Sequence, residues 1–169
     1  GGKVETGELT AVLGPSGSGK STLLSALAVR KRATKGAVLR GRLKMNGRGI
    51  RPVALLQRSA FVPQSDLLFL DLTVLETLAF AAACKCPSSL GPTYRARAIG
   101  IVLKRLNLSG AAATTLVRHA SGGEQRRVSI GKELFSDPMF LFLDEPTTGL
   151  DAFQALSVVA CVVDFTKVG

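Results

Sequence analysis

The glycine-rich stretch GPSGSGKS at residues 14–21 constrains the fold more than any other part of this chain. The segment GELTAVLG at residues 7–14, which we interpret as a buried strand, leads into it, and leucines at helical spacing follow from Lys20 to about Arg32. A stretch of the form G-x-x-x-x-G-K-S/T between a buried strand and a helix predicts a phosphate-binding loop. Its glycines let backbone N–H groups turn towards phosphate oxygens, and the helix N-terminus adds a partial positive charge.

Each residue of this loop has an expected place in a nucleotide site. The Lys20 ammonium can reach the β and γ phosphates, and the Ser21 hydroxyl can ligate Mg²⁺. A glycine-rich turn with a purely structural role is the alternative. The residues of this segment that we expect to contact the nucleotide are Gly14, Pro15, Ser16, Gly17, Ser18, Gly19, Lys20, Ser21 and Thr22.

A second glycine-rich stretch, RHASGGEQRR at residues 118–127, also has the composition of an anion-binding site. Ser121 and Glu124 have the spacing of a capping box, which predicts a helix from there to about Phe135. The stretch also carries two basic side chains, Arg126 and Arg127, that could serve an anion. An ordinary capped helix is the alternative.

The apolar run MFLFL, followed by two carboxylates, marks the other half of the expected site. An uninterrupted apolar run is typical of a fully buried parallel strand. Ligands of open parallel sheets bind at the carboxyl ends of the strands, where Asp144 and Glu145 follow this run. We expect Asp144 to hold the magnesium shell and Glu145 to polarise an attacking water. A structural role for Glu145, in a helix cap or an ion pair, is the alternative.

The remaining pattern predicts an α/β fold with a P-loop core, in which flanking helices cover a mostly parallel sheet. Residues 1–64 and 121–169 form the expected core, with an antiparallel hairpin at Asn46-Gly47, and residues 65–120 form an inserted helical subdomain. The other expected elements are a strand over 59–64, a helix from the capping box Thr73–Glu76 to about Cys84, a helix over 94–106 and a helix over 151–166.

The net charge of +10 raises the question of an anionic partner. The basic residues are spread along the chain, and the densest region, from Arg30 to Arg51, contains no aromatic residue. We therefore favour a solvated basic surface and expect no nucleic-acid partner. A basic face beside an anionic membrane surface is a further option.

The three cysteines, Cys84, Cys86 and Cys161, match neither a zinc pattern nor a C-x-x-C redox pair. We expect reduced thiols in a cytosolic setting, with a Cys84–Cys86 disulfide as the less favoured alternative. No stretch approaches the roughly 18 uninterrupted apolar residues that a membrane-spanning helix needs. The sequence also begins without the basic and apolar regions of a signal peptide.

Four motifs in order, GPSGSGKST, FVPQ, SGGEQRRVSIGKEL and LFLDEPTTGLD, resemble the nucleotide-binding domain of an ABC transporter. The resemblance covers nearly the whole chain and is strongest to the eukaryotic G subfamily, half-transporters that export sterols, lipids, pigment precursors or xenobiotics. It implies an ATP-hydrolysing cassette, incomplete at both ends, on the cytoplasmic face of a membrane. The implied cofactors are ATP and Mg²⁺.

The resemblance also implies roles for residues outside the first loop. Ser121, Gly122, Gly123 and Glu124 match the signature, which in this family contacts the ATP of a partner domain. Gln64 matches the glutamine that contacts ATP, Mg²⁺ or the attacking water, and Asp151 matches the aspartate of the D-loop. Without the resemblance, Gln64 would be interpreted as a turn residue and Asp151 as a helix cap.

The implied partners are a second nucleotide-binding domain, identical or not, and a transmembrane domain C-terminal to this one. The family's switch histidine would lie beyond Gly169, and His119 is not expected to replace it. A non-transport ABC ATPase of the translation or DNA-repair type is an alternative. The 56 residues from 65 to 120 are too few and too irregular for the coiled coil of the repair type. A third option is a module that binds ATP without turnover.

Overall fold

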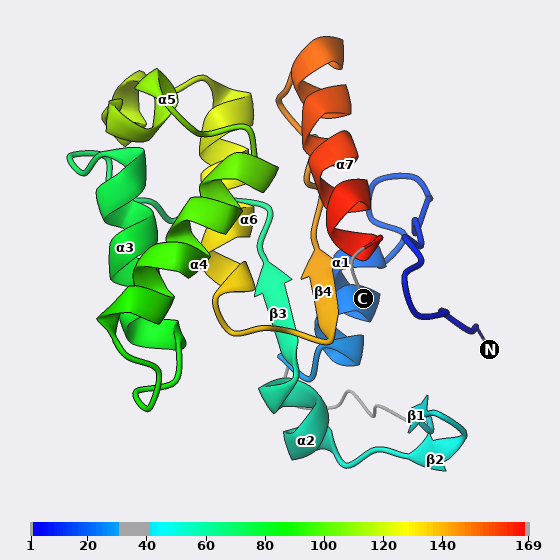
Figure 1. Ribbon diagram of the computed structural model, residues 1–169. Helices are drawn as coiled ribbons and strands as arrows, with labels where there is room; N and C mark the ends of the chain where they lie inside the picture. Colours follow the sequence, from blue (N-terminus) through cyan, green and yellow to red (C-terminus); the bar gives the residue numbers. More distant parts are fainter. Residues whose placement is uncertain (1, 31–40, 168–169) are drawn as a thin grey trace.

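The computed structural model describes residues 2–30 and 41–167, and its centre is a pair of parallel strands with helices on both sides (Figure 1). Helices α3, α4 and α6 lie on one side of the strands, and α1 lies on the other. The elements are α1 Lys20–Leu27, β1 Lys44–Met45, β2 Arg48–Gly49, α2 Pro52–Gln57, β3 Ser59–Val62, α3 Val74–Lys85, α4 Pro92–Arg105, α5 Ala111–Thr114, the 3₁₀ turn η1 Val117–His119, α6 Gly122–Leu134, β4 Phe140–Leu143 and α7 Ala152–Thr166.

Strands β3 and β4 are parallel, as the apolar run at 139–143 predicts. Their register pairs Ser59 with Phe140 and Val62 with Leu143, so that the two strands end side by side. The strand β4 is half-buried along its whole length, whereas the sequence predicts full burial. In the described ranges β4 pairs with β3 alone, which leaves its other edge uncovered by a strand.

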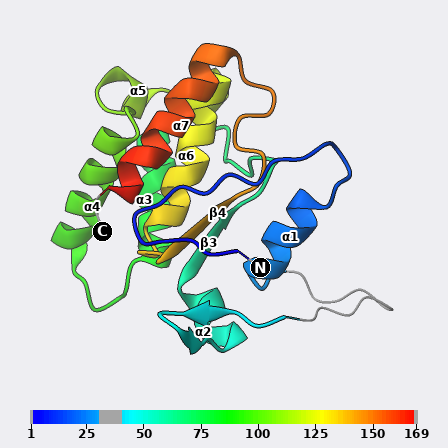
Figure 2. The same ribbon diagram turned by 90° about the vertical axis from the view of Figure 1, so that its right-hand side faces the viewer.

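The predicted buried strand over residues 7–14 is not formed, and this expectation is wrong. The described segment before α1 makes no ladder with another strand (Figure 2), and Leu9, Val12 and Leu13 are 45, 38 and 90% exposed. An apolar run becomes a strand only when a neighbouring strand accepts and donates its backbone hydrogen bonds. The P-loop is therefore reached through an extended segment without a strand partner.

Helix α1 begins at Lys20 as predicted but ends at Leu27, earlier than the expected end near Arg32. The Arg30 N–H donates to the Ser25 carbonyl at 2.9 Å and the Val29 N–H to the Ala26 carbonyl at 3.1 Å. These two bonds are a Schellman motif, which closes the helix. Val29 has a φ of 56°, a left-handed conformation that a β-branched residue rarely adopts. Residues 31 and 32 lie outside the described ranges.

Short-range signals elsewhere are confirmed. Asn46 and Gly47 have φ values of 50° and 76°, as a type I′ turn requires, and they join β1 to the antiparallel β2. Capping boxes begin α3 at Thr73 and α6 at Ser121. Helix α2 is an element that the sequence analysis did not predict, and it begins with a proline at its first position.

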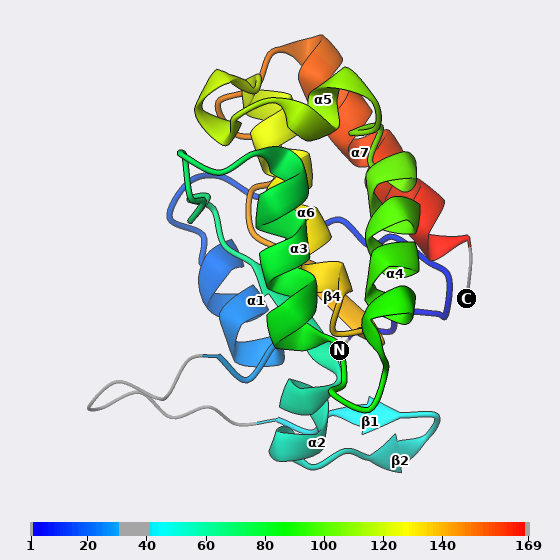
Figure 3. The ribbon, with the colours of Figure 1, turned by 60° about the vertical axis from the view of Figure 1, so that its left-hand side comes forward.

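Helix α6 packs against α3, α4, α7 and β3, which places it at the centre of the hydrophobic core (Figure 3). The core is one continuous cluster, and its fully buried side chains include Val62, Leu78, Leu106, Val128 and Val158. Helix α6 packs most tightly against its neighbours at Gly131. A Cβ atom added there would lie 2.7 Å from Leu106 Cδ1 and 3.0 Å from Leu78 Cδ2.

We expect Gly131→Ala to lower the free energy of unfolding by about 1–2 kcal/mol, because overpacking there exceeds the gain in helix propensity. Gly100→Ala is the matched control, since Gly100 also lies inside a helix but has no atom within 4 Å of an added Cβ. It should raise the free energy of unfolding by about 0.5–1 kcal/mol. Urea denaturation measures both. If both substitutions stabilise the chain equally, close packing is not what requires glycine at position 131.

Candidate functional site

The glycine-rich loop ends at the first turn of α1 with its backbone open to solvent. Gly17 and Gly19 have φ values of 77° and 93°, conformations that favour glycine, and Gly19 is the residue before the helix. Residues 14–19 are exposed. Since Gly19 has no side chain to cap the helix, the first amides of α1 can face an anion.

The Lys20 side chain lies along the loop that precedes it. Its ammonium donates to the Gly14 carbonyl at 2.9 Å and to the Pro15 carbonyl at 3.0 Å. Both acceptors are neutral and on the exposed side of the molecule. The cation is thus held at the loop by bonds that a phosphate, with its full negative charge, could replace.

A hydrogen bond between Ser21 and Asp144 joins the beginning of α1 to the end of β4. The Ser21 hydroxyl donates to Asp144 Oδ1 at 2.8 Å. Asp144 is 8% exposed, and its own N–H donates to the Val62 carbonyl, which continues the β3–β4 pairing by one residue. Two residues that are 123 positions apart in the sequence therefore meet at the phosphate loop.

A second contact at the same edge joins Gln64 to Glu145. The Gln64 amide Nε2 donates to Glu145 Oε2 at 2.7 Å, and the Thr148 hydroxyl donates to the same oxygen at 3.0 Å. Glu145 has a φ of 45°, so its backbone is in the left-handed region. Strain of this kind persists where the surroundings fix the residue, and it is found most often at functional sites.

The donors at this edge fit a magnesium ion. A hydroxyl, a carboxylate and an amide oxygen, from Ser21, Asp144 and Gln64, are the hard oxygen ligands that Mg²⁺ prefers. Among the described residues no three side chains of His, Cys, Asp or Glu form a cluster that could hold a metal.

The stretch at Ser121–Glu124 begins α6 and lies apart from the loop before α1 (Figures 1 to 3). Glu124 Oε2 accepts from the Ser121 N–H at 2.8 Å, and Ser121 Oγ accepts from the Glu124 N–H at 3.3 Å. The Gly123 N–H donates to Gln154 Oε1 at 2.9 Å, so one of the helix-end amides is bound within the chain. The structure does not bring this stretch together with the phosphate loop of the same chain.

The beginning of α7 explains the two glycines of that stretch. A Cβ at Gly122 would lie 3.2 Å from Leu150 Cδ2, and a Cβ at Gly123 would lie 3.1 Å from Gln154 Cβ. Asp151 caps α7 by accepting the Gln154 N–H at 2.9 Å. The interpretation of Asp151 as a helix cap is therefore confirmed. A cap can also take part in an interface between two domains, and Asp151 lies beside the start of α6.

The expectation that Arg126 and Arg127 serve an anion at the start of α6 is wrong. Both are buried, with 4% and 8% of their surfaces exposed. Arg127 donates to Ser157 Oγ on α7, whereas Arg126 donates mainly to backbone carbonyls of the site. The helical periodicity of α6 could have indicated that these positions face inward. The contacts of Arg126 were missed because they join segments distant in the sequence, whereas Thr148 donates to Glu145 only three residues away and was missed although the contact is local.

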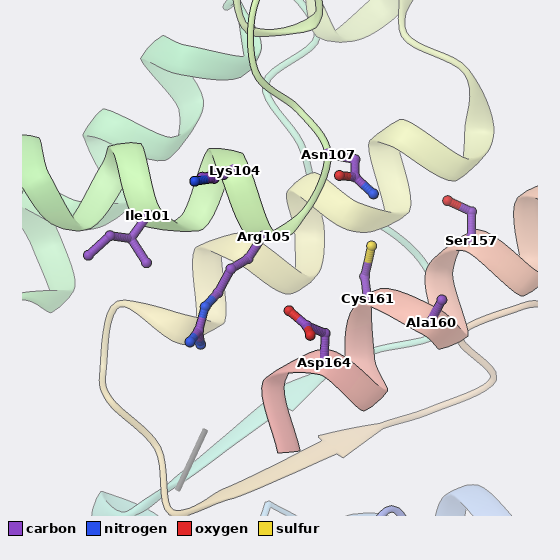
Figure 4. A pocket seen from close by; sticks show the side chains of 8 residues that line it. All are labelled: Ile101, Lys104, Arg105, Asn107, Ser157, Ala160, Cys161 and Asp164. Carbon is purple, nitrogen blue, oxygen red and sulfur yellow. The ribbon is translucent and has the colours of Figure 1, made fainter. Parts of the chain in front are cut away.

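A hollow of about 560 Å³ lies between α4 and α7, away from the residues predicted to bind nucleotide (Figure 4). It contains both charge signs, and the Cys161 sulfur lies at its wall. Its lining residues are Ile101, Lys104, Arg105, Asn107, Ser157, Ala160, Cys161 and Asp164.

The three thiols are free, so the alternative of a Cys84–Cys86 disulfide is wrong. Cys84 is exposed, whereas Cys86 and Cys161 are buried. Burial raises the pKa of the Cys161 thiol, although the nearby positive charge of Arg127 opposes this shift. At a given pH a raised pKa means less thiolate, which is the reactive form.

We therefore expect a disulfide reagent at pH 8 to modify Cys84 at least tenfold faster than Cys161. Time-resolved modification followed by peptide mass spectrometry measures the two rates separately. Unfolding in urea should remove most of the difference, because it exposes both thiols. Equal rates in the folded chain would contradict the burial described for α7.

Comparison with known proteins gives one family for most of the chain. A family model described as ABC transporter matches residues 2–148. ABC transporter G family member 6 of Arabidopsis thaliana is 48% identical over 162 residues, which are 94% of this chain and 22% of that protein. ABC transporter G family member STR of Petunia hybrida is 42% identical over 99% of this chain and 20% of its own length. The chain thus spans about a fifth of the curated relatives it matches.

Two solved structures share the fold. The ATP-binding cassette MJ0796, in a dimeric post-hydrolysis state bound to ADP and Pi, has a TM-score of 0.73 and 25% identity, covering 98% of this chain and 72% of that one. The protein cbiO1 of Clostridium perfringens, part of the ABC transporter complex cbiONQ, has a TM-score of 0.79 and 26% identity, covering 97% of this chain and 64% of that one. The predicted α/β fold class of a P-loop NTPase is confirmed.

Proposed function

Because the chain belongs to the ABC transporter family, we propose that it is the ATP-binding and ATP-hydrolysing cassette of a G-subfamily exporter. The observation that carries the proposal is the meeting of Ser21 with Asp144 and of Gln64 with Glu145, beside the phosphate loop. A nucleotide triphosphate needs these groups in one place: amides and a cation for its phosphates, oxygens for a metal, and a carboxylate for water.

The phosphates would be held by the loop of residues 14–19, by the first amides of α1 and by Thr22 on its first turn. Lys20 would exchange its two carbonyl acceptors for phosphate oxygens, which carry more negative charge. Ser21, Asp144 and Gln64 are the residues that would hold Mg²⁺, and the ion, when bound, supplies positive charge to the phosphates. Nucleotide binding thus converts internal hydrogen bonds into contacts with the ligand.

Glu145 would orient and polarise the water that attacks the γ-phosphate. Its carboxylate lies at the carboxyl end of β4, one residue after Asp144, and accepts hydrogen bonds from Gln64 and Thr148. These two donors fix the direction of its free oxygen. Hydrolysis in this class of reaction depends on positioning and charge stabilisation, which a carboxylate held in this way provides.

The signature residues Ser121, Gly122, Gly123 and Glu124 would contact the nucleotide of a second copy or a related domain. Their separation from the phosphate loop within one chain supports this, as does the dimeric state of the cassette MJ0796. In a two-fold dimer the same two surfaces occur twice, so that each nucleotide lies between a loop and a partner's signature. Asp151, beside the start of α6, would then lie near the interface.

Ser121→Arg is expected to block ATP-driven dimerisation while the single chain keeps its affinity for ATP. The added side chain fills the surface that would meet the partner's γ-phosphate. Ser121→Ala controls for the lost cap, worth about 1 kcal/mol, and Ser88→Arg controls for an added charge elsewhere. Size-exclusion chromatography with light scattering in Mg-ATP measures the result. A dimer that survives Ser121→Arg would overturn the head-to-tail arrangement.

The proposal extends to the protein's setting. The cassette would lie at the cytoplasmic face of a membrane. A membrane-spanning domain would follow it in the full-length chain, and residues 65–120 would form the helical subdomain that contacts that domain. No helix in the described ranges is long and apolar enough to cross a bilayer. The transported substrate, a lipid, sterol or xenobiotic by analogy with the subfamily, would be chosen by the membrane domain.

The direct test is the binding of ATP by the purified chain with and without Mg²⁺, followed by phosphate release. We expect saturable binding that weakens at least tenfold when the metal is chelated. A non-transport ABC ATPase would give the same result, and detection of membrane spans in the full-length reading frame separates the two. A module without turnover would bind but release no phosphate. Absence of binding in Mg²⁺ would overturn the proposed function.

A further inference from the structure

We propose that Arg126, in the second turn of α6, is a positioning residue for the magnesium site and holds the backbone of Gln64 and of Asp144 in register. The proposal rests on the proposed function, because it assigns Arg126 a task in the same site. Arg126 does not bind the side chains of Gln64 and Asp144. It acts through the backbone carbonyls of these two residues.

The first set of contacts fixes the segment after β3. Arg126 Nη1 donates to the Pro63 carbonyl at 2.7 Å and to the Gln64 carbonyl at 3.3 Å. The same nitrogen forms an ion pair with Asp66 Oδ1 at 2.7 Å. One end of the guanidinium thus binds three residues of the segment that leaves β3, Pro63, Gln64 and Asp66, and the Asp66 carboxylate anchors it there.

The second set fixes the segment after β4. Arg126 Nη2 donates to the Asp144 carbonyl at 2.8 Å, and Nε donates to the Pro146 carbonyl at 3.2 Å. These carbonyls flank Glu145, whose left-handed φ of 45° needs support from its surroundings. A single rigid plane therefore ties the ends of both parallel strands together.

The arrangement depends on arginine rather than on any cation. The guanidinium is planar and delocalised and offers five donors in a fixed fork, whereas a lysine ammonium is a compact group with three. Arg126 is 4% exposed, so water cannot replace a lost partner there. Lysine could keep the ion pair with Asp66 but could not reach the carbonyls on both strands at once.

The consequence for the site follows from two hydrogen bonds. The Gln64 side chain meets Glu145 at 2.7 Å, and the Asp144 side chain meets Ser21 at 2.8 Å. The first pair spans the two strand ends that Arg126 joins, and the second joins α1 to the end of β4 that Arg126 holds. Without the guanidinium, the segments that follow the β3–β4 pairing lose their shared anchor, and the oxygen ligands for Mg²⁺ lose their common geometry.

A neighbouring contact strengthens this role of α6. Lys132, about two turns further along, donates to the Leu67 carbonyl at 2.6 Å. The segment from residue 63 to residue 67 is thus bound to α6 at both of its ends. Its position follows that of the helix.

The experiment compares Arg126→Lys with Arg127→Lys. Arg127 is the matched control, since it is adjacent on α6 and also buried but donates to Ser157 on α7 rather than to the strand ends. Chemical denaturation first establishes that each variant is folded. The first readout is the ¹⁵N–¹H resonance of the Gln64 side-chain amide without nucleotide, assigned with Gln64→Glu. The second is the concentration of Mg²⁺ that half-saturates ATP binding.

We expect Arg126→Lys to move the Gln64 amide resonance to the position of glutamine amides that are hydrogen-bonded only to water, and to raise the half-saturating Mg²⁺ concentration at least fivefold. Arg127→Lys should leave both unchanged. A folded Arg126→Lys variant with an unmoved Gln64 resonance would overturn the proposal, whatever its Mg²⁺ dependence. If Arg126→Lys does not fold, Asp66→Asn replaces it as the test, because it weakens the ion pair that anchors the guanidinium. We expect this variant to move the Gln64 amide resonance in the same direction by a smaller amount. An unmoved resonance in Asp66→Asn would also overturn the proposal.

The two readouts separate this inference from the proposed function. If the unmodified chain binds no ATP, the proposed function fails, yet the Gln64 resonance still tests whether Arg126 positions that side chain. If ATP binds normally and the resonance does not move, only the inference fails.

Discussion

Glu145→Gln lowers the rate of phosphate release by a factor of about 10²–10⁴ and leaves ATP affinity within about twofold of the unmodified chain. A positioned general base contributes a factor of this size, and an amide cannot accept the proton of the attacking water. The substitution keeps an oxygen that can accept from Gln64 and Thr148, which lie 2.7 and 3.0 Å from Glu145 Oε2. The fold and the nucleotide site should therefore persist.

The measurement is steady-state phosphate release at saturating Mg-ATP, with binding titrated in parallel. Glu133→Gln is the matched control, because Glu133 lies at the far end of α6 in an ion pair with Lys85, about two turns beyond the contact of Arg126 with Asp144. It should change turnover less than about twofold. Equal rates for Glu145→Gln and the unmodified chain would exclude Glu145 as the group that activates water.

Lys20→Ala weakens ATP binding by about 10- to 100-fold. A hydrogen bond to a charged group contributes about 1.5–3 kcal/mol, and each 1.4 kcal/mol is a factor of ten in affinity. In the free chain the lysine only bridges the Gly14 and Pro15 carbonyls, both on the exposed side, so the substitution should cost little stability. The loss then reflects the contact with phosphate rather than unfolding.

Lys44→Ala on β1 is the control for a change in net charge. Lys44 is exposed and lies in the hairpin, and its loss removes the same single charge from the chain. Titration of a fluorescent ATP analogue should show an affinity within about twofold of the unmodified chain. If both substitutions weaken binding equally, the basic character of the chain as a whole attracts the nucleotide, and Lys20 has no special contact.

The features that the sequence predicted well are those with local causes. The capping boxes at Thr73 and Ser121 and the turn at Asn46-Gly47 each depend on residues within four positions of one another. The glycine loop and the run that ends in Asp144 were also recognised, since each is a contiguous motif. Their meeting through Ser21 followed from the rule that ligands bind where parallel strands end.

The features that the sequence did not predict depend on partners distant in the chain. Residues 7–14 have the composition of a buried strand, but no neighbouring strand in the described ranges provides the ladder. The stretch with Arg126 was recognised as basic, and only the folded chain shows that its guanidinium lies among carbonyls. The left-handed conformation of Val29, which ends α1, has no sequence signal either, because glycine is the usual residue there.

Helix α6 is capped at Ser121 and holds both strand ends through Arg126, little more than one turn later. Because these two positions are so close on one helix, a tilt of the first turn of α6 would also move the Arg126 guanidinium. In a head-to-tail pair, departure of phosphate from beneath one subunit's α6 would therefore disturb the metal ligands on that same subunit, which serve the other nucleotide. The two ATP molecules of such a pair would not be hydrolysed independently, and the first event would alter the timing of the second.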